Sequence, residues 1–135
     1  MDTLKNLHIH HIGYLVKNID KAEAEFVALG YTIINEKCRD DYRKVDIVFL
    51  EKEGYCVELI SPYAEDSVVS GLMKRFKNSP YHICYETDDY DKCFELLRAQ
   101  GYVPFDENTP APAISGRRVQ FFTHPKLGMI EILNG

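Results

Sequence analysis

Two histidines and two glutamates occupy matching places in the two halves of this chain. His11 and His82 each open an apolar segment in the context His-Ile-x-Tyr, 71 residues apart (82 − 11). Glu58 and Glu131 each stand inside an apolar stretch near the end of their half. Burying a carboxylate is costly, so each glutamate must pair, reach solvent or bind a cation. Two imidazoles and two carboxylates on one face would form a divalent metal site.

Each of these residues also has an ordinary interpretation. A single histidine before an apolar strand is more often structural or exposed, and a single glutamate between apolar residues can simply face solvent. Matching positions in both halves favour a shared role. His8 and His10 have no counterpart in the second half, so we interpret them as surface or edge residues. His124, in Thr-His-Pro-Lys, is interpreted as a turn residue.

The internal repeat extends well beyond the histidines. His11 to Tyr31 aligns with His82 to Tyr102 without a gap. We therefore expect one domain over residues 1–135 with two modules, at about 8–61 and 80–135, and a linker helix within 62–79. The identical pairs are His11/His82, Ile12/Ile83, Tyr14/Tyr85, Asp20/Asp91, Lys21/Lys92, Ala28/Ala99, Gly30/Gly101 and Tyr31/Tyr102.

The pattern of apolar residues predicts the same element order in both modules: a strand, a helix, then three strands. The fold class is therefore α+β, with two tandem βαβββ modules whose curled sheets surround a metal-binding cup. Asp106 to Gly116, rich in proline and small residues, is predicted to be a functional loop. The predicted strands are 8–16, 31–36, 45–50, 55–61, 81–87, 102–105, 118–123 and 129–133, and the helices are 19–29, 67–76 and 90–100.

Composition narrows the class of protein. The net charge of −5 argues against a nucleic-acid partner, which needs a concentrated positive face. No apolar run approaches the roughly 20 residues of a membrane helix, and the first residues lack the apolar core of a signal peptide. A cytoplasmic protein is expected. The four cysteines show no C-x-x-C spacing, so reduced thiols are favoured over disulfides or a structural zinc site.

The ligand types also limit the expected cofactor, which is one divalent metal ion. Two imidazoles and two carboxylates, completed by two waters, suit an octahedral borderline cation. Nickel, cobalt, zinc and manganese fit this description, and so does iron. Structural zinc, by contrast, prefers thiolate-rich tetrahedral sites. Open water positions indicate that a ligand with adjacent oxygens binds there.

Several segments together resemble the vicinal-oxygen-chelate superfamily, which contains glyoxalases, bleomycin resistance proteins and dioxygenases. The resemblance spans His8 to Leu133 and is most similar to small bacterial glyoxalase I proteins (lactoylglutathione lyases) and methylmalonyl-CoA epimerases. It implies His11, Glu58, His82 and Glu131 as metal ligands. The segments are His11-Ile-Gly-Tyr-Leu-Val, Val57-Glu-Leu-Ile-Ser-Pro, Pro80-Tyr-His-Ile-Cys-Tyr-Glu, and His124-Pro-Lys with Ile130-Glu-Ile-Leu.

The resemblance implies a metal-dependent lyase or isomerase. Our main hypothesis is a glyoxalase I-like reaction on a thiol hemithioacetal, with Glu131 as the first choice for the proton-transferring base and Glu58 as the second. The loop from Thr109 to Arg118 favours this activity, as does the absence of a glutamate from Val45 to Leu50 that could serve as a second epimerase base.

The alternatives are a methylmalonyl-CoA epimerase-like enzyme acting on an acyl thioester and a non-catalytic metabolite- or antibiotic-binding protein. An extradiol-type oxygenase is less favoured because it uses only one carboxylate with its two histidines. Both enzymatic hypotheses imply a small thiol adduct or acyl thioester as substrate, and a homodimer. Arg117, Arg118 and Lys126 are the predicted contacts to the acidic substrate.

Overall fold

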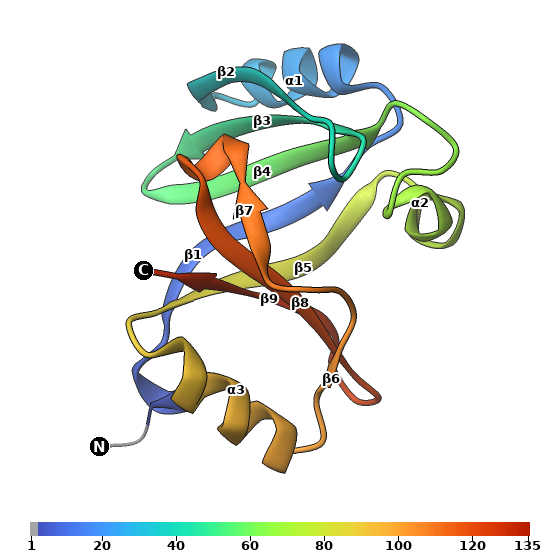
Figure 1. Ribbon diagram of the computed structural model, residues 1–135. Coiled ribbons are helices and arrows are strands. Elements are labelled where there is room, and N and C mark those ends of the chain that lie inside the picture. The colour runs from blue at the N-terminus through green and yellow to red at the C-terminus, as the bar shows by residue number, and fades with distance from the viewer. Residues whose placement is uncertain (1–2) are drawn as a thin grey trace. The chain divides into compact units, whose positions relative to one another are not determined.

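The computed structural model describes residues 3–135, and the chain divides into two compact units. The contiguous unit contains His11–Tyr81. The split unit contains His82–Gly135 together with the chain up to His10. Figure 1 labels the elements of both units. Residues 3–10 therefore belong to the same unit as the second half of the chain.

In the contiguous unit the strand order is β2-β3-β4-β1. β3 pairs with β2 and β4 in antiparallel fashion, whereas β1 runs parallel to β4. A turn at Glu53-Gly54, where both residues have positive φ, joins β3 to β4. The elements are β1 (His8–Leu15), α1 (Ile19–Ala28), β2 (Thr32–Asp40), β3 (Val45–Lys52), β4 (Tyr55–Pro62) and α2 (Ser70–Phe76).

The split unit has the order β5-β9-β8-β6, with β5 parallel to β9. The predicted loop at 106–116 is partly ordered, because a short strand, β7, pairs with β8 and a 3-10 turn follows it. The elements are η1 (Leu4–Asn6), β5 (Ser79–Thr87), α3 (Tyr90–Ala99), β6 (Val103–Pro104), β7 (Thr109–Ala111), η2 (Pro112–Ile114), β8 (Arg117–His124) and β9 (Gly128–Asn134).

The repeat explains why α1 and α3 begin and end where they do. Asn18 accepts a hydrogen bond from the Lys21 amide at 3.0 Å, and Asp89, 71 residues later (89 − 18), accepts one from the Lys92 amide at 3.2 Å. Such side chains satisfy the free amides of a first helical turn. Each helix is followed by a glycine in a left-handed conformation, Gly30 and Gly101.

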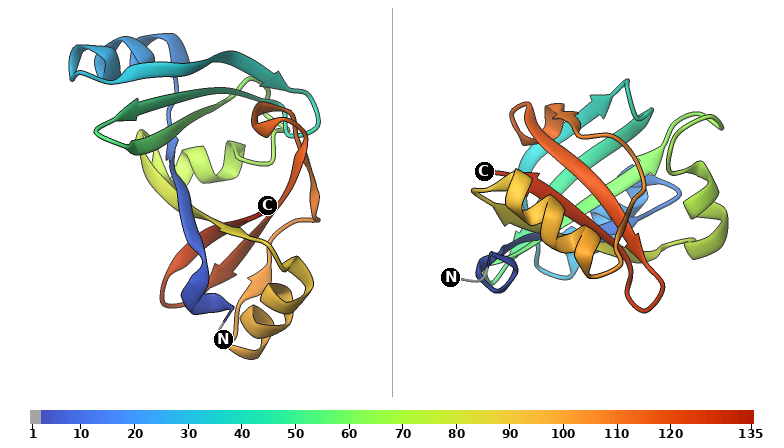
Figure 2. Two further views of the ribbon diagram at one scale, coloured as in Figure 1. Left: turned by 90° about the vertical axis from the view of Figure 1, so that its left-hand side faces the viewer. Right: turned by 60° about the horizontal axis from the view of Figure 1, so that its bottom comes forward.

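Each helix covers one face of the strands in its own unit. In the contiguous unit, Leu50, Val57 and Leu59 form a buried cluster with Ile19 of α1. In the split unit, Phe122, Ile130 and Ile132 form a buried cluster with Cys93 and Leu97 of α3, and Leu4 of η1 packs against it. Figure 2 shows α3 beside the strands of this unit. Because side chains alternate along a strand, Glu58 and Glu131 lie on the opposite face from their apolar neighbours.

The α+β class and the repeated strand–helix–strands order are confirmed. The boundaries needed correction mainly in β2, which continues to Asp40 rather than ending at 36, and in α2, which begins at Ser70 rather than 67. The extra residues of β2 pair with the start of β3 after two register shifts, and sequence periodicity does not show such shifts. Among residues 3–135, no helix is both long and apolar enough to cross a membrane.

Candidate metal centre

The first half-site joins β1 to β4 in the contiguous unit. His11 Nε2 lies 3.2 Å from Glu58 Oε1, and the two side chains are 0% and 5% exposed. The parallel register pairs Gly13 with Glu58, so His11 reaches the carboxylate diagonally from two residues before. Two ionisable groups are thus held together in an interior where neither carries its full hydration.

The second half-site joins β5 to β9 in the split unit. His82 Nε2 lies 3.1 Å from Glu131 Oε1, and these side chains are 0% and 6% exposed. The register pairs Cys84 with Glu131, so His82 again lies two residues before the residue opposite the glutamate. Both modules therefore build the same pair by the same register.

A phenylalanine backs each histidine. Phe49 stands opposite Glu58 on β3 and meets the His11 ring edge-on, with centroids 5.3 Å apart. Phe121 stands opposite Glu131 on β8 and meets the His82 ring in the same way, at 4.9 Å. Neither phenylalanine was predicted from the sequence to belong to the site. They fix the ring orientations, since an imidazole packed against an aromatic face has little room to turn.

The donor geometry fits a bound cation. Nitrogen and oxygen ligands lie about 2.1 Å from a transition metal, so two of them at a right angle are about 3.0 Å apart. The observed separations of 3.2 and 3.1 Å are close to this value in both half-sites. Each pair therefore has the spacing of adjacent ligands around an octahedral ion.

Cys56 lies two residues before Glu58 on β4. Burial, together with the nearby charges of Glu58 and Glu51, raises the pKa of Cys56 to about 11. A thiol with this pKa stays protonated near neutral pH in the absence of a metal ion. All four cysteines are free, in agreement with the prediction of reduced thiols.

The three predicted substrate contacts differ in their surroundings. Arg117 forms an ion pair with Glu86, which lowers the pKa of that carboxyl group, and its Nε donates to the Asn134 carbonyl. Arg118 donates to the Asn108 carbonyl at 2.6 Å but is otherwise exposed. Lys126 is exposed in the turn after β8. Arg118 and Lys126 are separated by most of a strand, roughly 20 Å, so they cannot contact the same small group.

A family model supplies the decisive comparison. The model of the glyoxalase/bleomycin resistance protein/dioxygenase superfamily matches residues 10–121. The chain belongs to this superfamily. The resemblance inferred from the sequence motifs is therefore confirmed, and the repeated half-sites are features of a superfamily member.

The curated relatives of this superfamily member are acyl-CoA epimerases. An ethylmalonyl-CoA/methylmalonyl-CoA epimerase from Cereibacter sphaeroides is 26% identical over 120 residues, which cover 87% of this chain and 88% of the relative. This similarity supports the epimerase alternative better than the glyoxalase I hypothesis. The features that had favoured glyoxalase I, the composition of one loop and one missing glutamate, are local and depend little on the fold.

Solved structures show the same fold. A hypothetical protein from Bacillus halodurans has a TM-score of 0.82 at 21% identity, covering 96% of this chain and 95% of that protein. A methylmalonyl-CoA epimerase in complex with methylmalonyl-CoA and NH4+ has a TM-score of 0.78 at 21% identity, covering 96% and 94%. At these identities the structural likeness establishes the fold alone.

Proposed function

We propose that the two histidine–glutamate pairs together bind one divalent cation and that the protein epimerises an acyl-CoA at the carbon next to the thioester carbonyl. The observation that supports this proposal is the buried histidine–glutamate pair, which occurs in both units with the same strand register. The named epimerase relatives support the choice of reaction. Nickel, cobalt, zinc and manganese remain the candidate ions.

A bound divalent cation supplies Lewis-acid stabilisation of the negative charge that develops on the substrate oxygens when the α-carbon loses its proton. His11 and His82 would hold it through Nε2, the atom that already faces each glutamate. The phenylalanine behind each imidazole keeps that nitrogen aimed at the site. Glu58 and Glu131 would complete the protein ligands.

Inversion of a carbon centre requires that a proton leave one face and return to the other. Glu131 is the proposed base, and Glu58, its counterpart in the other module, is the second candidate for this role. Asp46 on β3 is a less suitable base because Arg39 donates to both of its carboxylate oxygens, at 2.9 and 3.1 Å. Both carboxylate oxygens of Asp46 are therefore already occupied by hydrogen bonds.

The acidic coenzyme would lie outside the buried pairs. Arg118 is the proposed phosphate contact, because its guanidinium is exposed, whereas that of Arg117 is already paired with Glu86. Lys126 remains a second predicted contact. The homodimer that the resemblance implied also remains a prediction.

The test measures the incorporation of deuterium at the α-carbon of the substrate. Metal-free protein is incubated with methylmalonyl-CoA in D2O, with and without added divalent metal, and label at the α-carbon is measured by mass spectrometry. We expect metal-dependent exchange together with inversion. Glu131→Gln is expected to slow exchange about 10²- to 10⁴-fold, the usual contribution of a general base. His82→Ala should no longer bind one metal ion per chain.

His8→Ala and Glu51→Gln serve as matched controls because both residues are exposed. They should exchange label at the wild-type rate. Rapid conversion of a methylglyoxal hemithioacetal, without exchange on methylmalonyl-CoA, would instead support the glyoxalase I hypothesis. Metal binding without turnover of either substrate would support a binding protein.

A further inference from the structure

The two half-sites differ at the residue opposite the glutamate. In the first module this residue is Gly13, and in the second it is Cys84. The two positions are equivalent in the repeat, 71 residues apart (84 − 13). The second module therefore adds a thiol where the first has no side chain.

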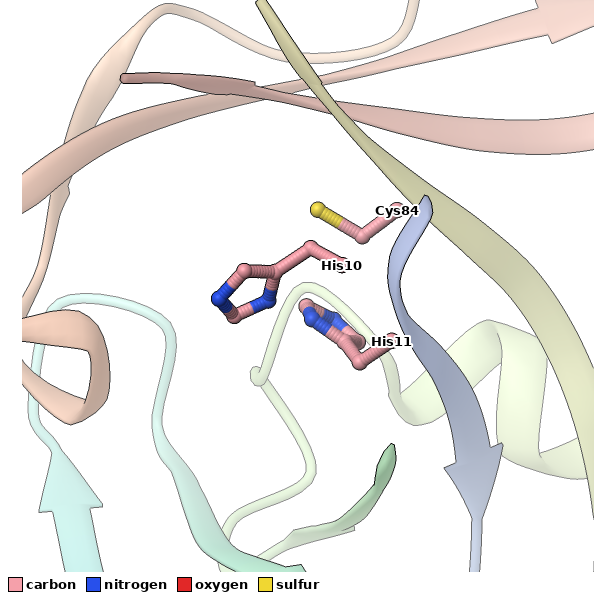
Figure 3. A group of neighbouring side chains, drawn as sticks. All are labelled: His10, His11 and Cys84. Atoms are coloured by element: carbon pink, nitrogen blue, oxygen red, sulfur yellow. The ribbon is translucent and has the colours of Figure 1, made fainter. Parts of the chain in front are cut away.

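Cys84 lies beside a second possible ligand from the same unit. The side-chain ligand atoms of His10 and Cys84 lie within 4.8 Å of each other. Figure 3 shows the two side chains next to each other, together with His11, the residue that follows His10 in the chain. Cys84 is fully buried, and His10, which was predicted to be a surface or edge residue, is half-buried.

The surroundings of Cys84 are apolar on one side. Ala111, Val119 and Leu133 form a buried cluster with it. Such a wall provides no oxygen ligands and little room for water. An ion bound by the thiol would therefore have a low coordination number.

We propose that His10 and Cys84 form a second metal site, specific for a soft monovalent cation such as Cu(I). Thiolate ligands select soft ions, whereas imidazole–carboxylate sets suit harder divalent ones. With metal–ligand bonds of about 2.0 to 2.3 Å, a linear two-coordinate ion separates its ligand atoms by about 4.3 Å, within the observed limit. The thiol releases one proton as the sulfur–metal bond forms, an imidazole lone pair makes the second bond, and the oxidation state of the metal does not change.

This site does not depend on the proposed epimerase activity. Its ligands are distinct from the two histidine–glutamate pairs, and both come from the split unit. Its position nevertheless places the thiol directly opposite Glu131 in the register. Loading with a soft cation therefore provides a probe of the second half-site.

The experiment is an anaerobic titration of metal-free protein with Cu(I) against a coloured Cu(I) chelator. We expect one tightly bound ion per chain, with an X-ray absorption spectrum of one sulfur and one nitrogen ligand. Cys84→Ser should lose this ion. His10→Ala should weaken binding at least about tenfold, within the range seen when a metal site loses a supporting group. Cys38→Ser, which removes a thiol from β2, should bind as the wild type does.

Glu58→Gln separates this proposal from the proposed function. The variant should keep Cu(I) binding even though it alters a ligand of the divalent ion. Circular dichroism checks the fold of each variant, and Cys84→Ala replaces Cys84→Ser if the serine variant does not fold. Wild-type Cu(I) binding in the Cys84 variant overturns the site, and unchanged affinity in His10→Ala overturns its two-ligand form.

Discussion

At the scale of single residues, the aromatic ring behind each histidine sets the orientation of the half-site. Phe121 and Phe122 are adjacent on β8 and point to opposite faces, one toward His82 and the other into the core below α3. Both residues are phenylalanine, so only the alternation of side chains along the strand gives them different roles. Substituting the two phenylalanines one at a time therefore separates the orientation of a metal ligand from the packing of the core.

We predict that Phe121→Leu lowers divalent metal affinity about tenfold or more, as loss of a group supporting a ligand typically does. Phe122→Leu should instead lower the free energy of unfolding by about 1 kcal/mol or more while metal affinity stays near the wild-type value. Isothermal titration calorimetry and urea unfolding measure the two effects. Equal metal affinities in the two variants would show that the ring behind His82 does not orient it.

At the scale of elements, the hairpin formed by β2 and β3 is organised by a buried ion pair. Asp40 accepts from the Arg43 backbone amide at 3.0 Å and from its guanidinium at 2.7 Å. The Ser67 hydroxyl donates to the Arg43 carbonyl at 2.7 Å and ties the hairpin to the segment before α2. The pair is almost completely shielded from solvent, whereas Arg39 in the neighbouring pair with Asp46 is largely exposed.

Removing one partner of each pair should therefore have unequal effects on stability. Asp40→Ala is expected to lower the free energy of unfolding by about 3–5 kcal/mol, because a buried guanidinium is left without its carboxylate. Asp46→Ala should cost less than about 1 kcal/mol, since exposed ion pairs contribute little. Chemical denaturation of the two variants and the wild type measures the difference. Similar losses of stability in the two variants would mean that solvent reaches Arg43.

The elements that the sequence predicted best are those whose signals are local. The caps Asn18 and Asp89 and the glycines after each helix lie in the part of the repeat that aligns without a gap. Phe49 and Phe121 were missed because their offset is 72 (121 − 49), while that of the histidines is 71. The segment between Tyr102 and Phe121 is one residue longer than the segment between Tyr31 and Phe49, so a comparison at one fixed offset loses the equivalence. Aligning the hairpins separately would have found it.

Other features depended on contacts that the sequence does not contain. The run Arg39-Asp-Asp-Tyr-Arg-Lys looks like an exposed turn, and only the pairing of β2 with β3 buries two of its charges. His10 has no counterpart in the repeat, so its neighbour Cys84 could not be inferred. The four metal ligands could be predicted without knowledge of such contacts, because the same residue types recur at matching places in the two modules.

At the scale of the whole molecule, each unit provides one histidine and one glutamate, and the proposed cation would depend on both units. A cation that binds only the native state stabilises it by about 2.7 kcal/mol at a free concentration 100 times the dissociation constant. We predict that this stabilisation protects amides in β4 and in β9 alike. Hydrogen exchange followed by mass spectrometry, with and without metal, measures the protection of these amides.

The matched variants are His11→Ala and His8→Ala. Losing His11 from the contiguous unit should remove metal-induced protection from β9 in the split unit, while losing the exposed His8 should not. Protection of β9 that persists in His11→Ala would mean that each pair binds its own ion. The proposal of one shared centre would then be wrong.

The division of the chain also sets an order of events during synthesis. The contiguous unit is complete once residue 81 has left the ribosome, and it can fold at that point. The split unit must wait for β9, which lies between β5 and β8 and ends at Asn134. At about 5–20 residues per second, the intervening residues take roughly 3 to 10 seconds to translate. Residues 3–10, which are translated before the contiguous unit, are thus among the last to acquire their native neighbours.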